Sequence, residues 1–285
     1  MFNNFPEILK KITRSFQFGP FSRSIQPIIE EVLAKHNKNK HRKGTKLTSS
    51  FLVWIVLTLT LRRDLSYPKL VNWLLSGIRW TNLNLPNKIV ECGAISHARV
   101  KLGVAVFRDI FYKFVAKFKT IEPDFYKWAT VMFDGTCLTM PDTASNLKKF
   151  KKHKAGRGKG AFPQMRAVAL MVLKQRVIID IAYAAIKGKK TGEKTLMMQI
   201  LEKVKIQNFL FLYDAGFYSF FLVWSMKKNG HDFIMKMSKS VNLPVLPKSR
   251  MPDGSYLSVV KRKVEDTSGP KKNERNGKKL NLLFV

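Results

Sequence analysis

The apolar residues of this chain change their spacing near residue 120, and this change limits the folds that the chain can adopt. From about Gln26 to Phe118, apolar side chains recur at the intervals of amphipathic helices. From Trp128 onward they form short runs separated by turn residues, a pattern typical of strands. The spacing therefore predicts a helical N-terminal part followed by a part that contains a sheet.

Start signals divide the helical part. Thr48 or Ser49 can cap a helix that carries the apolar run 51–61, and Pro68 suits the first turn of another helix. Ser96 precedes a third amphipathic stretch, which contains Val100, Leu102, Val106, Ile110 and Phe111. The run 51–61 is too short to cross a bilayer, because a span needs about 20 residues. We interpret this run as a buried helix and expect no membrane partner.

Beyond residue 120, short apolar runs and turn residues predict alternating strands and helices. We expect strands near 129–139, 164–174, 177–186, 208–213 and 233–237, with helices near 192–204 and 217–228. Three strands followed by alternating helix and strand indicate an α/β fold, a mixed sheet with helices on both faces.

The charge of the chain indicates its class of partner. Lysine and arginine total 52 against 19 aspartate and glutamate, so the net charge is +33. A charge this large repels itself in the compact state and attracts polyanions, which indicates DNA or RNA. Apolar residues make up 45% of the 285 positions, enough for a core, so a disordered basic tail is excluded.

The cysteines and the N-terminus bear on the cellular compartment. Cys92 and Cys137 form neither a metal-binding pair nor a disulfide framework, so we expect both to be buried free thiols. The first residues have neither the basic segment nor the small-residue cleavage site of a secretory signal. We therefore expect a cytoplasmic protein.

Acidic residues are scarce, which makes the placement of two aspartates informative. Asp134 and Asp214 each end an apolar run, and turn residues follow each of them. A carboxylate at the end of a buried strand lies at the rim of a sheet, where a cation can reach it. The alternative is that Asp134 starts an Asp-Gly turn and that Asp214 caps the next helix.

A basic segment follows the first aspartate. Seven of the thirteen residues from Lys148 to Gly160 are lysine or arginine, and glycines among them allow the backbone to follow a phosphate chain. The alternative for such a charge run is a solvated loop. The candidate nucleic-acid-binding residues are Lys148, Lys149, Lys151, Lys152, Lys154, Arg157, Lys159 and Arg166. A second basic region extends from Lys248 to Lys279.

Six short motifs occur in a fixed order along the chain. They are Arg63-Asp64-Leu65-Ser66-Tyr67, Ala98-Arg99-Val100-Lys101-Leu102-Gly103, Asp134-Gly135-Thr136, Pro141-Asp142-Thr143, Phe162-Pro163-Gln164-Met165-Arg166 and Asp214-Ala215-Gly216-Phe217-Tyr218-Ser219. In sequence and order they resemble bacterial transposases of the insertion sequence 4 family, over roughly residues 25–260. No single motif is specific, and their shared order carries the resemblance.

The resemblance implies a transposase that cleaves and transfers DNA strands in transposition. Its catalytic domain would be RNase H-like, with two aspartates and a glutamate holding two divalent ions, Mg²⁺ or Mn²⁺. Asp134 and Asp214 would be the catalytic and metal-binding aspartates. The implied partners are double-stranded DNA, at transposon ends and target, and a second copy in a synaptic complex at the bacterial nucleoid.

The resemblance also suggests domain limits. Residues 1–120 would form a helical domain for DNA binding and assembly, 121–240 the RNase H-like catalytic domain, and 241–285 a basic part of a β-rich insertion.

The third acid of the family lies on a helix beyond that insertion, and its signature is not found before Val285. Glu265 is a late acid, but with Asp266 it more simply neutralises a basic loop. We therefore expect a truncated transposase with an incomplete active site. Two alternatives stay open, a noncatalytic DNA-binding remnant that regulates an intact relative and an RNase H-like nuclease.

Overall fold

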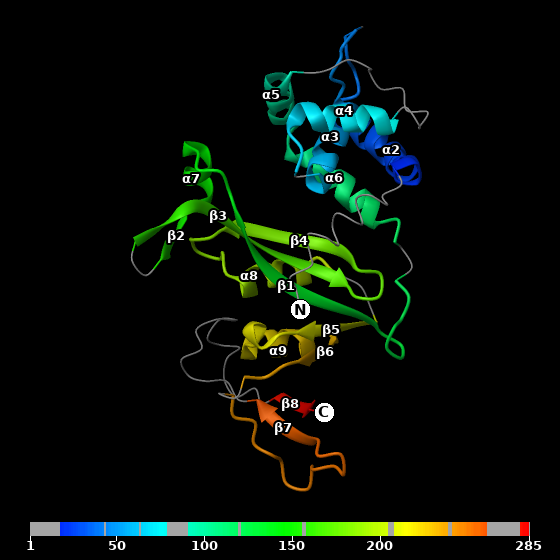
Figure 1. Cartoon of the computed structure of the whole chain (residues 1–285). Coiled ribbons are helices and arrows are strands. Elements are labelled where there is room, and N and C mark those ends of the chain that lie inside the picture. Colours follow the sequence, from blue (N-terminus) through cyan, green and yellow to red (C-terminus); the bar gives the residue numbers. More distant parts are fainter. Residues whose placement is uncertain are drawn as a thin grey trace. The chain divides into compact units, whose positions relative to one another are not determined.

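The chain forms two compact units, Met1–Lys119 and Thr120–Val285, which are described separately below (Figure 1). The computed structural model describes residues 18–42, 44–62, 64–78, 91–118, 121–155, 158–204, 208–238, 241–260 and 280–284.

Unit 1 is helical in the part that the structure describes, as the sequence predicted. Its helices are α2 (Phe18–Lys35), α3 (Ser49–Leu61), α4 (Tyr67–Ile78), α5 (Cys92–Leu102) and α6 (Val104–Val115). Thr48 is the residue that caps α3, because its side chain accepts a hydrogen bond from the backbone N–H of Phe51.

The apolar helix α3 forms the centre of unit 1. Phe51, Trp54 and Ile55 are fully buried, and each such side chain contributes about 1.5–3 kcal/mol through the area that it removes from water. Trp54 donates from Nε1 to Oε1 of Gln26 on α2 at 2.8 Å, which satisfies its only polar atom. The prediction of a buried helix is confirmed. Within the described ranges, no helix is long and apolar enough to cross a bilayer.

Gly103 divides the third apolar stretch, which therefore forms two helices. α5 ends before Gly103 and α6 begins after it, and its φ of 83° lies in the region that favours glycine. Val106 and Ile110 of α6 are buried, whereas Val100 of α5 is 85% exposed. The sequence-based interpretation of one continuous stretch was wrong because the break has little effect on the spacing of apolar residues.

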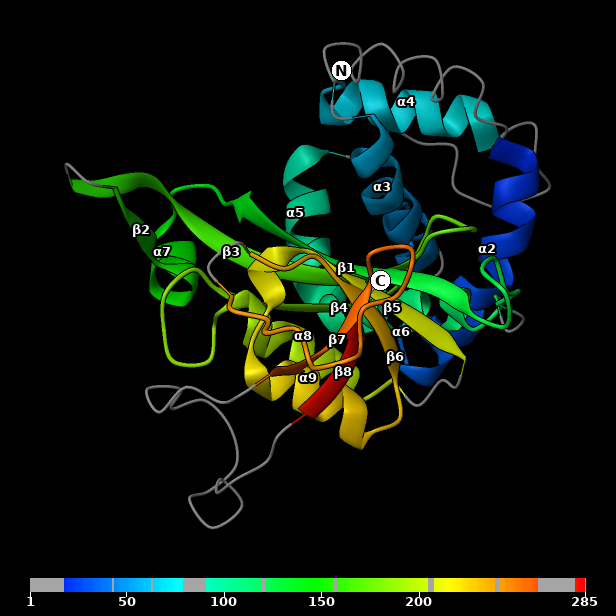
Figure 2. The same cartoon turned by 90° about the horizontal axis from the view of Figure 1, so that it is seen from below.

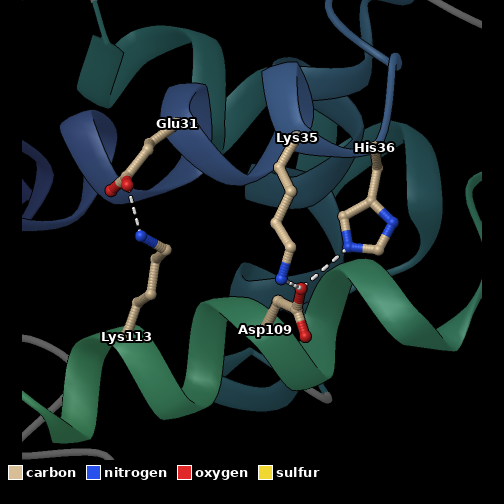
Figure 3. Close-up of polar contacts among 5 residues, drawn as sticks. All are labelled: Glu31, Lys35, His36, Asp109 and Lys113. Carbon is tan, nitrogen blue, oxygen red and sulfur yellow. Dashed lines mark hydrogen bonds and ion pairs between the residues drawn. The ribbon is translucent and has the colours of Figure 1, made fainter.

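Ion pairs join the C-terminal half of α2 to α6 (Figure 3). Asp109 accepts a hydrogen bond from Nζ of Lys35 at 2.7 Å, and Nε2 of His36 lies 3.0 Å from the same oxygen. Lys113 pairs with Glu31 one turn along. The bonds from Lys35 and then His36 lower the pKa of Asp109. These side chains are partly exposed, so they orient the two helices more than they stabilise them.

Replacing Asp109 with asparagine should lower the melting temperature at neutral pH, because Lys35 and His36 lose their shared carboxylate. The pKa of Asp109 in the folded chain lies below its usual value of about 3.9. Its contribution to stability is therefore present above that pH and is lost as the pH falls through the folded-state pKa. Thermal unfolding of both proteins across acid pH should show the two melting temperatures converge.

Asp64→Asn is the matched control, because Asp64 pairs with Arg62 inside one connecting segment. It should change the melting temperature less than Asp109→Asn does. Equal melting temperatures for wild type and Asp109→Asn at neutral pH would contradict the role given to this carboxylate.

Unit 2 is built on a six-stranded mixed sheet, which confirms the predicted α/β class. Its elements are β1 (Ala129–Thr139), α7 (Ala144–Phe150), β2 (Lys152–Ala155), β3 (Gly158–Val172), β4 (Val177–Ala185), α8 (Glu193–Leu201), β5 (Phe209–Tyr213), the 3₁₀ helix η1 (Ala215–Phe217), α9 (Phe220–Lys228), β6 (Asp232–Met235), β7 (Tyr256–Val260) and β8 (Leu280–Phe284). β7 and β8 form a separate antiparallel pair.

Strand β1 lies in the middle of the sheet. It pairs antiparallel with β3 on one side and parallel with β5 on the other. β4 is antiparallel to β3, and β6 is parallel to β5, which gives the order β4-β3-β1-β5-β6. β2 pairs with the first residues of β3, in a hairpin that follows α7.

Helices α8 and α9 lie against the same face of the sheet (Figure 2). Phe133 stacks on Tyr213, whose hydroxyl donates to Sδ of Met226 on α9 at 3.4 Å. Glu193 of α8 lies against Gly135, which shares the face of Phe133. The prediction of helices on both faces was wrong for these two. Helix α8 connects β4 to β5 and helix α9 connects β5 to β6, so both connections join parallel strands and run in the same direction across the sheet. Right-handed crossovers therefore place both helices on the same face.

Candidate active site

Asp134 lies in the middle of β1, where the strand leaves the core. Residues alternate between buried and half-buried as far as Phe133, and Asp134 is the first exposed residue. The strand continues to Thr139, with Asp134 opposite Ala169 of β3. The expectation that a turn follows Asp134, and the Asp-Gly turn alternative, were therefore wrong, because pairing with β3 keeps this segment extended.

Asp214 directly follows β5 and is exposed. Its Oδ1 accepts a hydrogen bond from the backbone N–H of Ala215 at 2.7 Å, and the residue caps the short helix η1. The predicted capping role is confirmed. A cap occupies one carboxylate oxygen in this way, and it does not conflict with a second role for the side chain.

The register of the sheet brings the two aspartates to the same level. The last paired residues of the parallel strands are Met132 and Leu212, and each aspartate follows two positions later. Residues at the same level on adjacent strands share a face, and adjacent strands lie about 4.8 Å apart. Asp134 and Asp214 thus lie at the same level, just beyond the point where the parallel pairing of β1 with β5 ends.

Both aspartates keep their negative charge available in a strongly basic chain. Ion pairs in the described residues use the carboxylates of Asp109, Asp64, Glu31, Asp142, Glu193 and Glu122. Neither Asp134 nor Asp214 forms an ion pair with another residue that the structure describes. Two exposed carboxylates that no described lysine or arginine pairs with can attract a cation from solution.

Carboxylate oxygens are hard ligands, and Mg²⁺ is often held by one or two carboxylates together with water and substrate phosphates. Asp134 and Asp214 therefore fit the ion that the resemblance implies. Within the described ranges, no three His, Cys, Asp or Glu residues gather closely enough to hold a metal by themselves. Glu265 lies outside those ranges, so the identity of a third acid stays a prediction.

Glu193 is an acid near Asp134 that sequence reasoning used only as the start of a helix. Its side chain lies so close to β1 that a Cβ atom built on Gly135 would come within 2.9 Å of Glu193 Cδ. Oε1 of Glu193 lies 3.6 Å from Nε of Arg166, which is on β3 opposite Cys137. The signal available in the sequence was the scarcity of acids together with the position in the first turn of the predicted helix 192–204.

Arg166, predicted to bind DNA, is engaged within unit 2. Its Nη1 donates to the backbone oxygen of Thr191 at 3.1 Å, and its side chain is only 23% exposed. Its Nε is buried and has no hydrogen-bond partner in the described structure. The guanidinium therefore connects β3 to the residues that begin α8, and its predicted contact with phosphate is still untested.

The predicted basic segment is a helix end followed by a hairpin, whereas we expected a glycine-rich loop. Lys148 and Lys149 lie in the last turn of α7, and Lys151 follows it with φ of 64°. Their side chains are exposed. Lys152 begins β2 and pairs with Asp142 at 2.7 Å. The side chains of Lys154 and Lys159, and all of Arg157, lie outside the described residues.

The cysteines differ from the expectation. Cys92 and Cys137 are both free, but both are exposed. Cys137 lies on the exposed end of β1, and Cys92 is the first residue of α5. Cysteine is frequently buried, but its type alone does not determine which part of a strand or helix faces the core.

Gly135→Ala tests the contact with Glu193. The added methyl group should displace the flexible end of the Glu193 side chain from Arg166, and loss of this partly exposed ion pair should lower the free energy of unfolding by less than about 1 kcal/mol. Denaturant unfolding of the full chain measures this change.

Gly216→Ala is the control, since a Cβ there meets no atom within 4 Å. It should leave the unfolding midpoint nearly unchanged. Equal effects of the two substitutions would show that the Glu193 contact does not constrain position 135.

Fold, charge and the paired aspartates together define a basic two-unit protein with an acidic candidate site on a mixed α/β sheet. Residues 16–112 match the family model described as the N-terminal region of insertion element 4 transposase. This part of the chain is therefore similar to the N-terminal region of insertion element 4 transposases, which supports the resemblance that the order of its motifs indicated. The matched residues include neither Asp134 nor Asp214.

A solved structure, described as the piggyBac transposase synaptic complex with hairpin DNA, is similar over 90% of this chain. The chain spans 58% of the length of that structure at 11% identity, with a TM-score of 0.32. This likeness is too low to show a common fold. Comparison with curated proteins gives no match.

Proposed function

We propose that the chain is a DNA transposase whose second unit binds a divalent cation between Asp134 and Asp214 and cleaves DNA strands there. The observation that carries the proposal is the register of β1 and β5, which brings both exposed carboxylates to one level on adjacent strands. The match of residues 16–112 to the N-terminal region of insertion element 4 transposase supports the transposase role, and the net charge of +33 supports a polyanionic substrate.

The topology of unit 2 also supports an RNase H-like catalytic domain. In the order β4-β3-β1-β5-β6, β3 is antiparallel to β1 and β4, while β5 and β6 are parallel to β1. The strands β1, β3 and β4 are joined as successive antiparallel neighbours. Helix α8 then connects β4 to β5, and helix α9 connects β5 to β6. The resemblance implied this kind of mixed sheet, with aspartates on its first and fourth strands.

In this proposal the two aspartates are held in different ways, one through its backbone and the other through its side chain. Asp134 extends from a strand that is paired with β3 beyond the end of β5, so its backbone is held. Asp214 lies at a strand end, and its Oδ1 is oriented by the N–H of Ala215. A bound divalent ion would activate the attacking oxygen and stabilise the leaving oxygen of a phosphodiester. Holding this ion, with substrate phosphate completing its shell, is the role given to both side chains.

Lys148, Lys149 and Lys151 are the strongest candidates for phosphate contacts. They are exposed and lie together at the end of α7, in the connection that joins β1 to the β2–β3 hairpin. Lys152 is less suited, because Asp142 already neutralises it. Such contacts position DNA without reading its sequence. Transposon ends and target DNA are the proposed substrates, and a homodimer within a synaptic complex is the proposed assembly.

The second candidate function is a noncatalytic DNA-binding protein of the same family. The observation that favours it is that no third acid joins Asp134 and Asp214 in a metal-holding group among the described residues. Metal-dependent cleavage by the chain separates the two functions.

Asp134→Ala and Asp214→Ala should each abolish Mg²⁺-dependent nicking of DNA while leaving DNA affinity unchanged, because they remove ligands rather than phosphate contacts. Gel assays of nicking and fluorescence anisotropy of binding measure the two properties. Asp232→Asn is the control, since that exposed carboxylate lies on β6 opposite Leu210, nearer the start of the parallel strands. Cleavage that persists in both alanine variants would refute the site.

Lys148→Glu combined with Lys151→Glu should weaken DNA binding and flatten its dependence on salt. Each lost phosphate contact should reduce the slope of log affinity against log salt by about 0.9. The control is the double variant Lys203→Glu with Lys227→Glu, which changes the net charge by the same amount at two other exposed lysines. Identical slopes for the two double variants would show that binding depends on net charge alone.

A further inference from the structure

The contact between Glu193 and Gly135 occurs at one particular point of the sheet. Asp134 is the residue before Gly135, and it is where β1 changes from buried to exposed. Beyond Met132, β1 has lost its partner β5 and is paired with β3 alone. The segment that carries the Asp134 carboxylate is therefore held on one edge only, and support from another element would matter there.

Arg166 and Glu193 provide a connection across this segment. Arg166 lies on β3 opposite Cys137, and Gly135, two residues before Cys137, lies opposite Val168. Its guanidinium donates to the oxygen of Thr191 and lies 3.6 Å from the Glu193 carboxylate. Glu193 in turn contacts the bare Cα side of Gly135. The pair thus ties β3 and the beginning of α8 to β1 beside Asp134.

We propose that Glu193 and Arg166 form a positioning pair, which holds the Asp134–Gly135 segment in the geometry that binds the divalent cation. This inference rests on the proposed function of Asp134. A side chain at position 135 would occupy the place of the Glu193 carboxylate, so glycine there lets the pair lie against β1. Arg166 then acts within the protein, and its partly shielded guanidinium contributes little to DNA affinity.

The charge of the pair explains why both partners are needed. An arginine that is only 23% exposed, with a buried Nε, depends on a nearby carboxylate. Removing Glu193 would leave the Arg166 guanidinium without its carboxylate partner beside Gly135. Removing Arg166 would free Glu193 from Gly135. Either change should loosen residues 134–137 and weaken cation binding by about tenfold, the lower range for partners of metal ligands.

The test uses the full chain and the variants Glu193→Gln, Arg166→Gln, the double variant and the milder Arg166→Lys. Amide hydrogen exchange of peptides covering residues 134–137, measured without metal, reports on the pair itself. Binding of Mn²⁺, measured by electron paramagnetic resonance, reports on the cation site, with Asp134→Ala as the reference for its loss. Glu122→Gln is the control, because it breaks another ion pair of unit 2, that with Lys174 at 2.9 Å.

We expect faster exchange at 134–137 and weaker Mn²⁺ binding in each single variant, with no further loss in the double variant. Glu122→Gln should change neither property. Unchanged exchange in all of the variants, or faster exchange with unchanged Mn²⁺ affinity, would overturn the positioning role alone. Equal Mn²⁺ affinity of wild type and Asp134→Ala would overturn the proposed cation site as well, and thus separates failure of the function from failure of the pair.

Discussion

Strand β1 is hydrogen-bonded on both edges, and the organisation of unit 2 depends on the difference between its two partners. Parallel pairing with β5 sets the level at which Asp134 and Asp214 meet. Antiparallel pairing with β3 continues for several residues beyond the end of β5, so the strand stays extended where it carries its exposed carboxylate. The same pairing places Arg166 opposite Cys137, within reach of the first residues of α8.

The large positive charge sets the second constraint. The chain has 52 basic and 19 acidic residues, and six carboxylates of the described residues form ion pairs with lysine, arginine or histidine. Several of them serve as structural partners, such as Asp109 between α2 and α6 and Glu193 beside Arg166. Asp134 and Asp214 differ, since both are exposed and neither pairs with a described basic residue. Two neighbouring carboxylates repel each other, and a cation bound between them would relieve that repulsion, as the proposed site requires.

Sequence reasoning succeeded where one local pattern dominated. The predicted strand 129–139 has the observed bounds of β1, and the cap at Thr48 and the burial of the helix 51–61 followed from side-chain type and spacing. It failed where a short element or a break leaves no periodic signal. α7 and β2 were interpreted as a basic loop, because seven and four residues are too few to show a period. Gly103 interrupts the helices without interrupting the apolar spacing.

The sequence by itself determined the helical and mixed α/β parts, the family resemblance and the choice of Asp134 and Asp214, because these follow from spacing, charge and residue order. Only the tertiary structure decided that the two aspartates are level, that α8 and α9 share a face, and that Glu193 meets Gly135 and Arg166. These facts depend on strand register and crossover direction, which join residues far apart in the chain. A one-residue shift in register would turn Asp134 to the opposite face, and no local pattern in the sequence encodes that register.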